Sequence, residues 1–333
     1  MDASPAAAEI ESTSAPRGPA APPRPAGPRE DDGRPTTGAP RLPIDQVREL
    51  TRPSGLSTFW VIGRDYAVIA AMIWLCEAYW HPALYLLAVV VIAARVSSLG
   101  GLIHEAVHYN LFKSKRMNDW VALVFCSWPL LGAFSLRAYR KSHLTHHKYA
   151  NTPLDPDPDI QGMKNIGSAR EAALFFWRGL TLPVVYFAKG FWGRPTAQRV
   201  IALFSVGLFV YFLPGVAERV LLYWLIPLLT VYSLFVFIRL NAEHNAVDAD
   251  EPLYRTRTVI PTLLSRLTVA PAYVGYHLAH HVYPSVPFFR RHALHEALWA
   301  SSEDYRRGAH ITRGYIRVVA ELLAYRGGPL IRD

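Results

Sequence analysis

Residues 83–103 read ALYLLAVVVIAARVSSLGGLI, and the five residues that follow read HEAVH. A membrane-spanning α-helix needs about 20 mostly apolar residues, and the first run meets that requirement. Two histidines, His104 and His108, stand just past its end at a spacing that puts both rings on one face of a helix. The stretch therefore predicts a spanning helix that presents two imidazoles at one membrane surface.

The composition of the whole chain favours a membrane protein over a soluble protein with buried helices. Of its 333 residues, 51% are hydrophobic and 18% are charged, whereas soluble domains average about 25% charged residues. The formal net charge of +9 agrees with basic cytoplasmic loops, and no basic helix or basic stripe with interleaved aromatics suggests nucleic-acid binding. Cys76 and Cys126 lie inside apolar runs without a CxxC partner, so we expect neither a disulfide framework nor a zinc knuckle.

Three further apolar runs complete a prediction of four transmembrane helices in two hairpins. They occupy residues 59–79, 199–215 and 220–238. Arg64 and Asp65 stand near the start of the first of these runs, where we expect their side chains to reach the lipid headgroups.

Three other regions are predicted to lie outside the spans. Residues 120–134 and 172–187 are weaker apolar segments that contain Pro and Gly, and we expect interfacial or partly inserted helices there. Residues 1–42 are rich in Pro, Ala and Gly, and they contain too few apolar side chains to offset the entropy of ordering. They are therefore predicted to be a disordered cytosolic tail.

The distribution of basic residues predicts which side of the membrane each part occupies. The connections within the two hairpins hold one Arg together, whereas residues 109–198 hold twelve Lys and Arg. By the positive-inside rule this long segment is cytoplasmic. With four spans, both termini and all the grouped histidines then lie on the cytoplasmic side as well.

Seven more histidines are grouped on this predicted side, in two HxxHH units and one NAEHN segment. In an HxxHH helix the first ring lies under both later rings, whose directions differ by about 100°. One helical turn can therefore serve two metal ions, and nine imidazoles suit a dinuclear site with open positions for oxygen. Imidazole binds iron, zinc and copper, so the donor type alone does not name the metal. The nine candidate ligands are His104, His108, His143, His146, His147, His244, His277, His280 and His281.

Other interpretations of these motifs are weaker. HEAVH satisfies the H-E-x-x-H pattern of zinc metalloproteases, but two HxxHH units at the same membrane face disfavour that reading. The aspartates of PLDPDPD lack the DxDxDG pattern of a calcium loop, and we expect a solvated turn with one carboxylate near the ligand histidines. The histidines outside the groups are predicted to be structural, and they are His81, His292, His295 and His310.

On these motifs the chain resembles the membrane fatty acid desaturases, whose superfamily includes membrane hydroxylases and carotenoid-modifying oxygenases. The resemblance covers roughly residues 55–310. It rests on four stretches, which are HEAVH (104–108), RKSHLTHHKYANTPLDPD (140–157), RLNAEH (239–244) and GYHLAHHVYPSVP (275–287).

The resemblance implies an all-α integral membrane fold, with four transmembrane helices in two hairpins and a cytosolic helical cap that carries the histidine boxes. Residues 43–333 would form this catalytic domain. It further implies a di-iron centre of two iron ions held by the nine histidines, with His244 as the ligand from the fourth span. O2 would be the co-substrate, and a separate ferredoxin or cytochrome b5-type donor would supply two electrons. The substrate would be a lipid or acyl chain among the membrane lipids, and no catalytic residue beyond the metal ligands is expected.

Two reaction outcomes stay open on such a scaffold. We favour a desaturase that introduces a double bond into an aliphatic chain, and the alternative is a hydroxylase or ketolase acting on a lipid or carotenoid-like substrate. Ligand spacing does not separate them. The third box begins with His277, where desaturases that act between an existing double bond and the carboxyl end usually have Gln. A metal transporter is disfavoured, because its polar residues would lie at the bilayer midplane.

Residues around the boxes also carry expectations. Glu243 is expected to orient a ligand histidine, whereas Asn241 lies three residues before His244, rather than the four found in some desaturases, which makes a water-holding role doubtful. No HPGG-type haem motif occurs in the sequence, so the electron donor is expected to be a separate protein. Basic residues could dock an acidic ferredoxin or meet lipid headgroups, and these are Arg137, Arg140, Lys141 and Lys148.

Overall fold

The computed structural model describes most of the chain from residue 40 to residue 324, and all of this part belongs to one compact unit, Asp31–Asp333. The predicted disordered tail, residues 1–42, lies outside the described residues except for its last three. The described residues are 40–127, 130, 135–152, 154–156, 168–192, 200, 203–204, 207–208, 211–213, 215–247, 255–271 and 274–324.

Helices dominate the described part, and three of its helical segments are long and apolar enough to cross a membrane. These candidate spans are Ile44–Ala78, Pro82–Val107 and Val216–His244. They cover the predicted runs 59–79 (up to Ala78), 83–103 and 220–238. Of the predicted span 199–215, 8 of 17 residues lie outside the described residues. The elements of the three spans are α1 (Ile44–Leu50) and α2 (Gly55–Ala78); α3 (Pro82–Val107); and α9 (Val216–Val220), the π-helical segments η3 (Leu221–Leu225) and η4 (Leu228–Tyr232), and α10 (Ser233–His244).

Local sequence explains where the first two spanning helices begin. The Ser54 hydroxyl accepts a hydrogen bond from the Ser57 N–H at 3.2 Å and caps α2. Nδ1 of His81 accepts a hydrogen bond from the Ala83 N–H at 3.2 Å, and Pro82 occupies the first turn of α3, where its fixed φ is already helical. His81 is thus a structural residue, as predicted.

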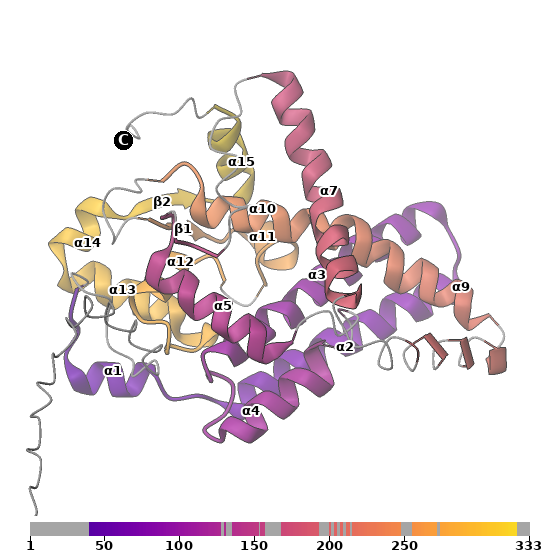
Figure 1. Ribbon diagram of the computed structural model, residues 1–333, viewed down its shortest axis with the longest axis horizontal. Helices are drawn as coiled ribbons and strands as arrows, with labels where there is room; N and C mark the ends of the chain where they lie inside the picture. The colour runs from indigo at the N-terminus through magenta and orange to yellow at the C-terminus, as the bar shows by residue number, and fades with distance from the viewer. Residues whose placement is uncertain are drawn as a thin grey trace, which may run out of the picture. The chain divides into compact units, whose positions relative to one another are not determined.

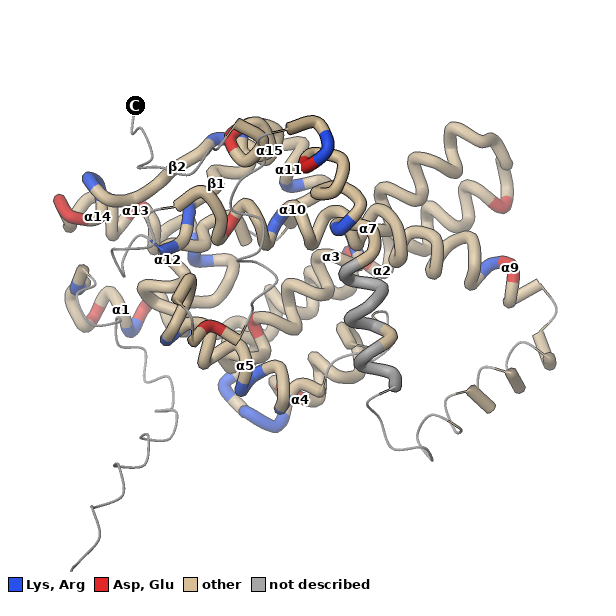
Figure 2. The backbone as a smooth tube through the Cα atoms, turned by 45° about the horizontal axis from the view of Figure 1, so that its top comes forward, with Lys and Arg blue, Asp and Glu red and all other residues tan. Residues whose placement is uncertain are grey.

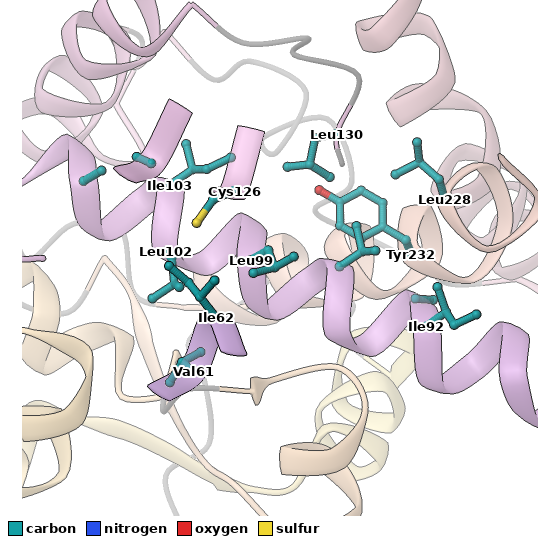
Figure 3. Close-up of a cluster of buried hydrophobic side chains, with 14 of the residues drawn as sticks. Val61, Ile62, Ile92, Leu99, Leu102, Ile103, Cys126, Leu130, Leu228 and Tyr232 are labelled. Atoms are coloured by element: carbon teal, nitrogen blue, oxygen red, sulfur yellow. The ribbon is translucent and has the colours of Figure 1, made fainter. Parts of the chain in front are cut away.

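The core of the membrane part is built around α3, which packs against α2 and η4 (Figures 1 and 3). Leu99 and Leu102 are fully buried in this core, and Gly100 lets Tyr232 approach the helix, since a Cβ there would lie 3.4 Å from the tyrosine oxygen. Cys126 is also buried there, and both cysteines are free thiols, as the sequence predicted. Long stretches of α2 and α3 carry no charged residue (Figure 2).

In the part of the chain that the structure describes, four helical elements with defined bounds lie between the second and third candidate spans. Residues 120–127 continue from an α-helix into a π-helical segment, and the rest of the predicted interfacial segment 120–134 lies, apart from the buried Leu130, outside the described residues. The predicted interfacial segment 172–187 lies within one 24-residue helix, which packs along α10 and is not among the candidate spans. The four elements are α4 (Lys115–Val121), η1 (Ala122–Ser127), α5 (Leu136–Tyr149) and α7 (Ala169–Trp192).

The C-terminal part corrects the all-α prediction, because it contains a two-stranded parallel sheet. The strands pair in the register Arg257↔His310 to Ile260↔Arg313. Their sequences, RTVI and HITR, are rich in β-branched residues, which favour extended backbone. The elements of this part are β1 (Arg257–Ile260), α11 (Leu263–Leu267), α12 (His277–Val282), the 3₁₀ turn η7 (Phe288–Arg290), α13 (Arg291–Ser301), α14 (Glu303–Gly308), β2 (His310–Arg313) and α15 (Tyr315–Ala324).

Candidate metal centre

Four helices bring all nine candidate ligands to one end of the membrane helices. The spanning helices α3 and α10 extend past their apolar runs and carry His104, the C-cap residue His108, and His244 there, and the short helices α5 and α12 carry the two HxxHH units. The nine rings form two groups, and within each group the ligand atoms lie within 4.8 Å of one another. The five-histidine group is His104, His108, His143, His147 and His280, and the four-histidine group is His146, His244, His277 and His281.

The division between the groups follows helical geometry. Each pair of histidines four residues apart stays in one group, whereas the middle histidine of each HxxHH unit joins the other group. Residues four apart differ in direction by about 40° and residues three apart by about 60° in the opposite sense. Each HxxHH unit therefore contributes to both groups, as its spacing predicted. His146 of α5 joins the group that contains His277 and His281, and His280 of α12 joins the group that contains His143 and His147.

The distances between ring nitrogens fit ligands of a common ion. Nε2 of His147 lies 3.0 Å from Nε2 of His143, and Nε2 of His281 lies 3.0 Å from Nε2 of His277. Nε2 of His277 is also 2.9 Å from Nε2 of His244. Two nitrogens bound at right angles to one metal ion at about 2.1 Å are about 3.0 Å apart. The donor set therefore fits a metal in each group.

Burial keeps five of these rings in the neutral form that a metal needs. They lie on α5 and α12 among other imidazoles, and desolvation disfavours their charged form. Desolvation, with the neighbouring imidazoles, lowers the pKa of His143, His147, His277, His280 and His281 well below the ordinary value. Nε2 of His280 is moreover a buried atom without a hydrogen-bond partner among the described residues, so that a metal would supply its missing contact.

Carboxylates support the rings of the four-histidine group. Both oxygens of Asp155 lie 3.0 Å from Nδ1 of His146, and the Asn151 N–H donates to the same carboxylate at 2.9 Å. With its Nδ1–H donated to Asp155, His146 presents an Nε2 lone pair to the centre. An oxygen of Glu243 lies 3.6 Å from Nδ1 of His277, which agrees with the predicted orienting role.

The five-histidine group has both a carboxylate and an arginine beside its rings. An oxygen of Glu105 lies 3.4 Å from Nδ1 of His104. The Glu105 carboxylate pairs with the guanidinium of Arg291, and both side chains are almost fully buried. The same carboxylate accepts the Phe288 N–H at 2.9 Å. The Arg291 guanidinium in turn donates to Nδ1 of His280 at 2.9 Å. A neutral ring that accepts at Nδ1 carries its proton on Nε2, so this proton must leave or Arg291 must turn before His280 binds a metal through Nε2.

Sequence analysis missed the contribution of Arg291 and only partly identified Asp155. Arg291 follows the third box by ten residues, at no spacing that is typical of a ligand or its partner. Asp155 stands in the PLDPDPD run that the sequence placed near the ligands, and the other two aspartates of that run, Asp157 and Asp159, lie outside the described residues.

Two other residues near the boxes have structural partners. The Asn241 amide donates to the Phe237 carbonyl at 2.8 Å and accepts from the Asn245 amide at 2.6 Å, in line with the doubt about a water-holding role. Arg140 pairs with Asp119 at 2.6 Å and donates to backbone carbonyls at the end of α3. Arg140 therefore links α5 to α3 and α4, which corrects its place in the expected docking face.

The remaining histidines of the described part pair away from the centre, as predicted. Nδ1 of His295 lies 3.0 Å from the Tyr305 hydroxyl, and His310 faces Glu321 at 3.5 Å. His292 is half-exposed and lies 3.9 Å from Glu296.

A cavity of about 40 Å³ adjoins the centre. Five of the nine histidines line it, and part of its wall is apolar, formed by Gly101, Leu240 and Val274. The space admits a molecule of the size of O2 or water, since one water needs about 10–15 Å³ of such volume. The histidines that line the cavity belong to both groups, so a small reactant in it would adjoin both.

Comparisons with known proteins agree with this site. The family described as fatty acid desaturase matches residues 78–313. The dihydrorhizobitoxine desaturase of Bradyrhizobium elkanii is 29% identical over 83% of this chain and 81% of its own length. A beta-carotene ketolase of a Paracoccus strain is 26% identical over 73% of this chain and 92% of its own length. The match covers most of the chain and includes all four histidine-bearing stretches, and the chain therefore belongs to the fatty acid desaturase family of membrane oxidoreductases.

Proposed function

We propose that this chain is an oxygen-dependent di-iron enzyme that introduces a double bond into an aliphatic chain of a lipid or acyl substrate. The observation that carries the proposal is the convergence of nine imidazoles into two groups with nitrogen–nitrogen distances suited to metal coordination. Groups of five and four nitrogens leave open positions around two six-coordinate ions, which suits a metal that must also meet oxygen. His104, His108, His143, His147 and His280 would hold one iron, and His146, His244, His277 and His281 the other.

The bound irons would supply the oxygen chemistry, and the protein would supply position and exclusion of water. Desaturation removes two hydrogens from adjacent methylenes, and one O2 is reduced to two waters with two electrons and two protons from outside. The electrons would come from a separate donor of the ferredoxin or cytochrome b5 type. Asp155 and Glu243 would fix the ring orientation of His146 and His277, and the apolar wall of Gly101, Leu240 and Val274 would meet the hydrocarbon.

A second outcome has specific support. The beta-carotene ketolase aligns over nearly its whole length, and its name assigns it an oxygen-inserting reaction on a hydrocarbon. One atom of O2 would then be inserted into a methylene C–H bond, and the other would be reduced to water with two electrons and two protons from the donor. A second such round at the same carbon, followed by loss of water, would give a ketone. We therefore propose hydroxylation or ketolation of a lipid or carotenoid-like substrate as the alternative.

The membrane arrangement that we propose keeps four spans, with residues 43–333 as the catalytic domain. α5 lies at the histidine end of the helices, whereas α9 meets the far end of α2, where Arg219 pairs with Glu77 at 2.7 Å. This arrangement supports a further crossing between residues 150 and 215, and we propose the expected span 199–215 for it. By the positive-inside rule the histidine boxes, their helical cap and both termini would be cytoplasmic.

The test compares the wild type with two single variants in a host supplied with candidate lipids and a carotenoid. His146→Ala removes a ligand of the four-histidine group, and His292→Ala removes a half-exposed ring outside both groups. Extracts are analysed by mass spectrometry after growth under ¹⁸O2, and the iron content of each purified protein is measured.

A product short of two hydrogens and free of ¹⁸O, made by the wild type and His292→Ala but not by His146→Ala, would support the desaturase. A product that carries ¹⁸O would decide for the hydroxylase or ketolase. A purified wild-type protein without iron would contradict both proposals.

A further inference from the structure

A second cavity, of about 620 Å³, lies beside the first turns of α2 and away from the nine histidines. Its wall is mostly apolar, and among the described residues that line it two are arginines and none is acidic. The arginines are Arg64 of α2 and Arg266 of α11, and the larger apolar side chains are those of Leu56, Trp60, Phe288 and Phe289.

Arg64 is positioned by a buried ionic network inside the candidate spans. Asp65 is fully buried, and one of its oxygens accepts from Arg64 at 2.7 Å and from Arg95 of α3 at 3.2 Å. This corrects the expectation that Asp65 reaches the lipid headgroups. Ionisable residues within membrane helices are costly and commonly mark functional sites. The network therefore indicates a functional site nearby.

The network also holds the helix that carries the second arginine. Arg95 donates to the carbonyl of Leu267, the last residue of α11, at 3.0 Å. The end of this short helix, whose carbonyls have no partner within the helix, is thereby tied to α3. Arg266 precedes Leu267 directly and lines the same cavity as Arg64.

The charges around the cavity suit an anion. Two positive charges from Arg95 and Arg64 face the single negative charge of Asp65, and the guanidinium of Arg266 also lines the cavity. Leu56 and Ser57 of the cavity wall belong to the first turn of the 24-residue helix α2, whose dipole is positive at that end. An anionic group is therefore favoured in this cavity over a neutral or cationic one.

The surroundings of the cavity suit a hydrocarbon chain. Trp60 is 68% exposed and Leu263 of α11 is 74% exposed, on elements that belong to or are tied to the candidate spans. Such exposed apolar side chains at the ends of spans contact lipid. A chain that lies along Trp60, Phe288 and Phe289 would replace water on these residues.

We propose that this cavity binds an anionic amphiphile, with its carboxylate or phosphate between Arg64 and Arg266 and its hydrocarbon chain along Trp60, Phe288 and Phe289. The proposal goes beyond the proposed function, because the site contains no metal ligand and needs no turnover. The cavity is nevertheless connected to the centre, since the Phe288 N–H donates to the Glu105 carboxylate that holds Arg291.

Native mass spectrometry of the detergent-purified full chain tests this site without any assay of activity. The probes are dioleoyl phosphatidylglycerol, dioleoyl phosphatidylcholine and oleate, each titrated against the wild type, Arg266→Gln and Arg307→Gln. Arg266 is an exposed residue, so its substitution spares the buried network, whereas Arg64→Gln would unbalance Asp65. Arg307 is the matched control, because it is exposed on α14 and paired with Glu303.

We expect the first bound phosphatidylglycerol to bind Arg266→Gln roughly tenfold more weakly than the wild type or Arg307→Gln, as the loss of a charge-assisted hydrogen bond predicts. Phosphatidylcholine should bind the three proteins alike and more weakly. If only the affinity for oleate is lower in Arg266→Gln, the proposal stands and a fatty acid is the source of the anion. Equal binding of both phospholipids, or equal binding of every probe to Arg266→Gln and Arg307→Gln, would overturn it.

A second variant tests the apolar half of the site. Trp60→Ala should weaken the anionic probe that responds to Arg266 several-fold, because roughly 25 cal/mol is lost for each Å² of apolar surface that the ligand no longer covers. An unchanged affinity in Trp60→Ala would overturn the proposed path of the hydrocarbon chain.

Discussion

Two carboxylates, Asp155 and Glu243, lie beside rings of the four-histidine group. The five-histidine group has one carboxylate, Glu105, 3.4 Å from Nδ1 of His104, and it also has the guanidinium of Arg291 at Nδ1 of His280. A carboxylate that accepts an Nδ1–H leaves a lone pair on Nε2 and raises its basicity. A guanidinium that donates to Nδ1 has the opposite effect on His280. Two groups with similar donors are therefore expected to hold their metal ions with different strength.

The largest effect is expected when one ligand is removed from each group in turn. His281→Ala and His280→Ala should each lower product formation by more than about a hundredfold, because even the partner of a ligand is worth about 10- to 100-fold. Each variant should keep about one iron per chain, since the other group is intact.

Mössbauer spectra of the two variants would show whether the retained irons differ. Identical spectra, or the loss of both irons from each variant, would contradict the comparison of two separate and unequal sites.

The second largest effect concerns folding stability, and it tests whether Arg291 depends on Glu105. Glu105→Gln leaves a buried guanidinium without its counter-charge, which should cost about 3–5 kcal/mol of folding free energy. Glu77→Gln breaks the partly exposed pair with Arg219 at the far end of the helices and should cost less than about 1 kcal/mol. Thermal unfolding of the metal-free proteins in detergent compares the two, and a Glu105→Gln protein as stable as Glu77→Gln would show that Arg291 does not depend on this carboxylate.

A smaller effect is expected at the four-histidine group. Asp155→Asn should weaken the binding of its metal about 10- to 100-fold, because His146 loses the charged partner of its Nδ1. Competition with a chelator measures this affinity, and Asp45→Asn, at an exposed pair with Arg48, is the control. Unchanged iron retention in Asp155→Asn would show that the Asp155 carboxylate does not strengthen metal binding by this group.

The smallest effect is a pH dependence close to the four-histidine group. Arg257 donates to the carbonyls of Asn245 and Ala246, directly after His244, and pairs with Glu321 at 2.9 Å. Burial opposes ionisation of Glu321, but its hydrogen bond with His310 and the charge of Arg257 outweigh burial and lower its pKa below the ordinary 4.5.

A carboxyl group whose pKa is lowered by folding stabilises the folded state above its ordinary pKa. This stabilisation is lost as the pH falls through the lower pKa of the folded state. Thermal unfolding is measured at pH values from about 6 to about 3, which bracket this transition. The unfolding temperature should fall more steeply with falling pH in the wild type than in Glu321→Gln. Parallel curves would show that Glu321 does not contribute to acid sensitivity.

Local spacing predicted how the histidines divide between two groups, because helical geometry relates near neighbours in the chain. The i, i+4 pairs of HEAVH and of both HxxHH units share a group, and the i+3 rings point to the other, as rotation about one helix axis requires. The apolar runs likewise predicted the spans, since the length of a hydrophobic run is a property of the sequence alone.

Contacts between distant segments escaped the same reasoning. Arg291 reaches Glu105 across 186 residues, and β1 pairs with β2 across a connection of several helices, which left the all-α prediction incomplete. Asp65 looked like a residue for the headgroups until Arg95, thirty residues away, was found to pair with it inside the helices. Such pairs leave no periodic signal in the sequence.

The sequence by itself determined that this protein is a helical membrane protein with nine grouped histidines, because hydrophobic length and helical spacing are local properties. The tertiary structure decided which histidines share a group, which charge stands behind each ring, and where Arg64 and Arg266 line a cavity away from the centre. These features depend on the packing of segments far apart in the chain, and the energies that select them arise only when those segments are buried together.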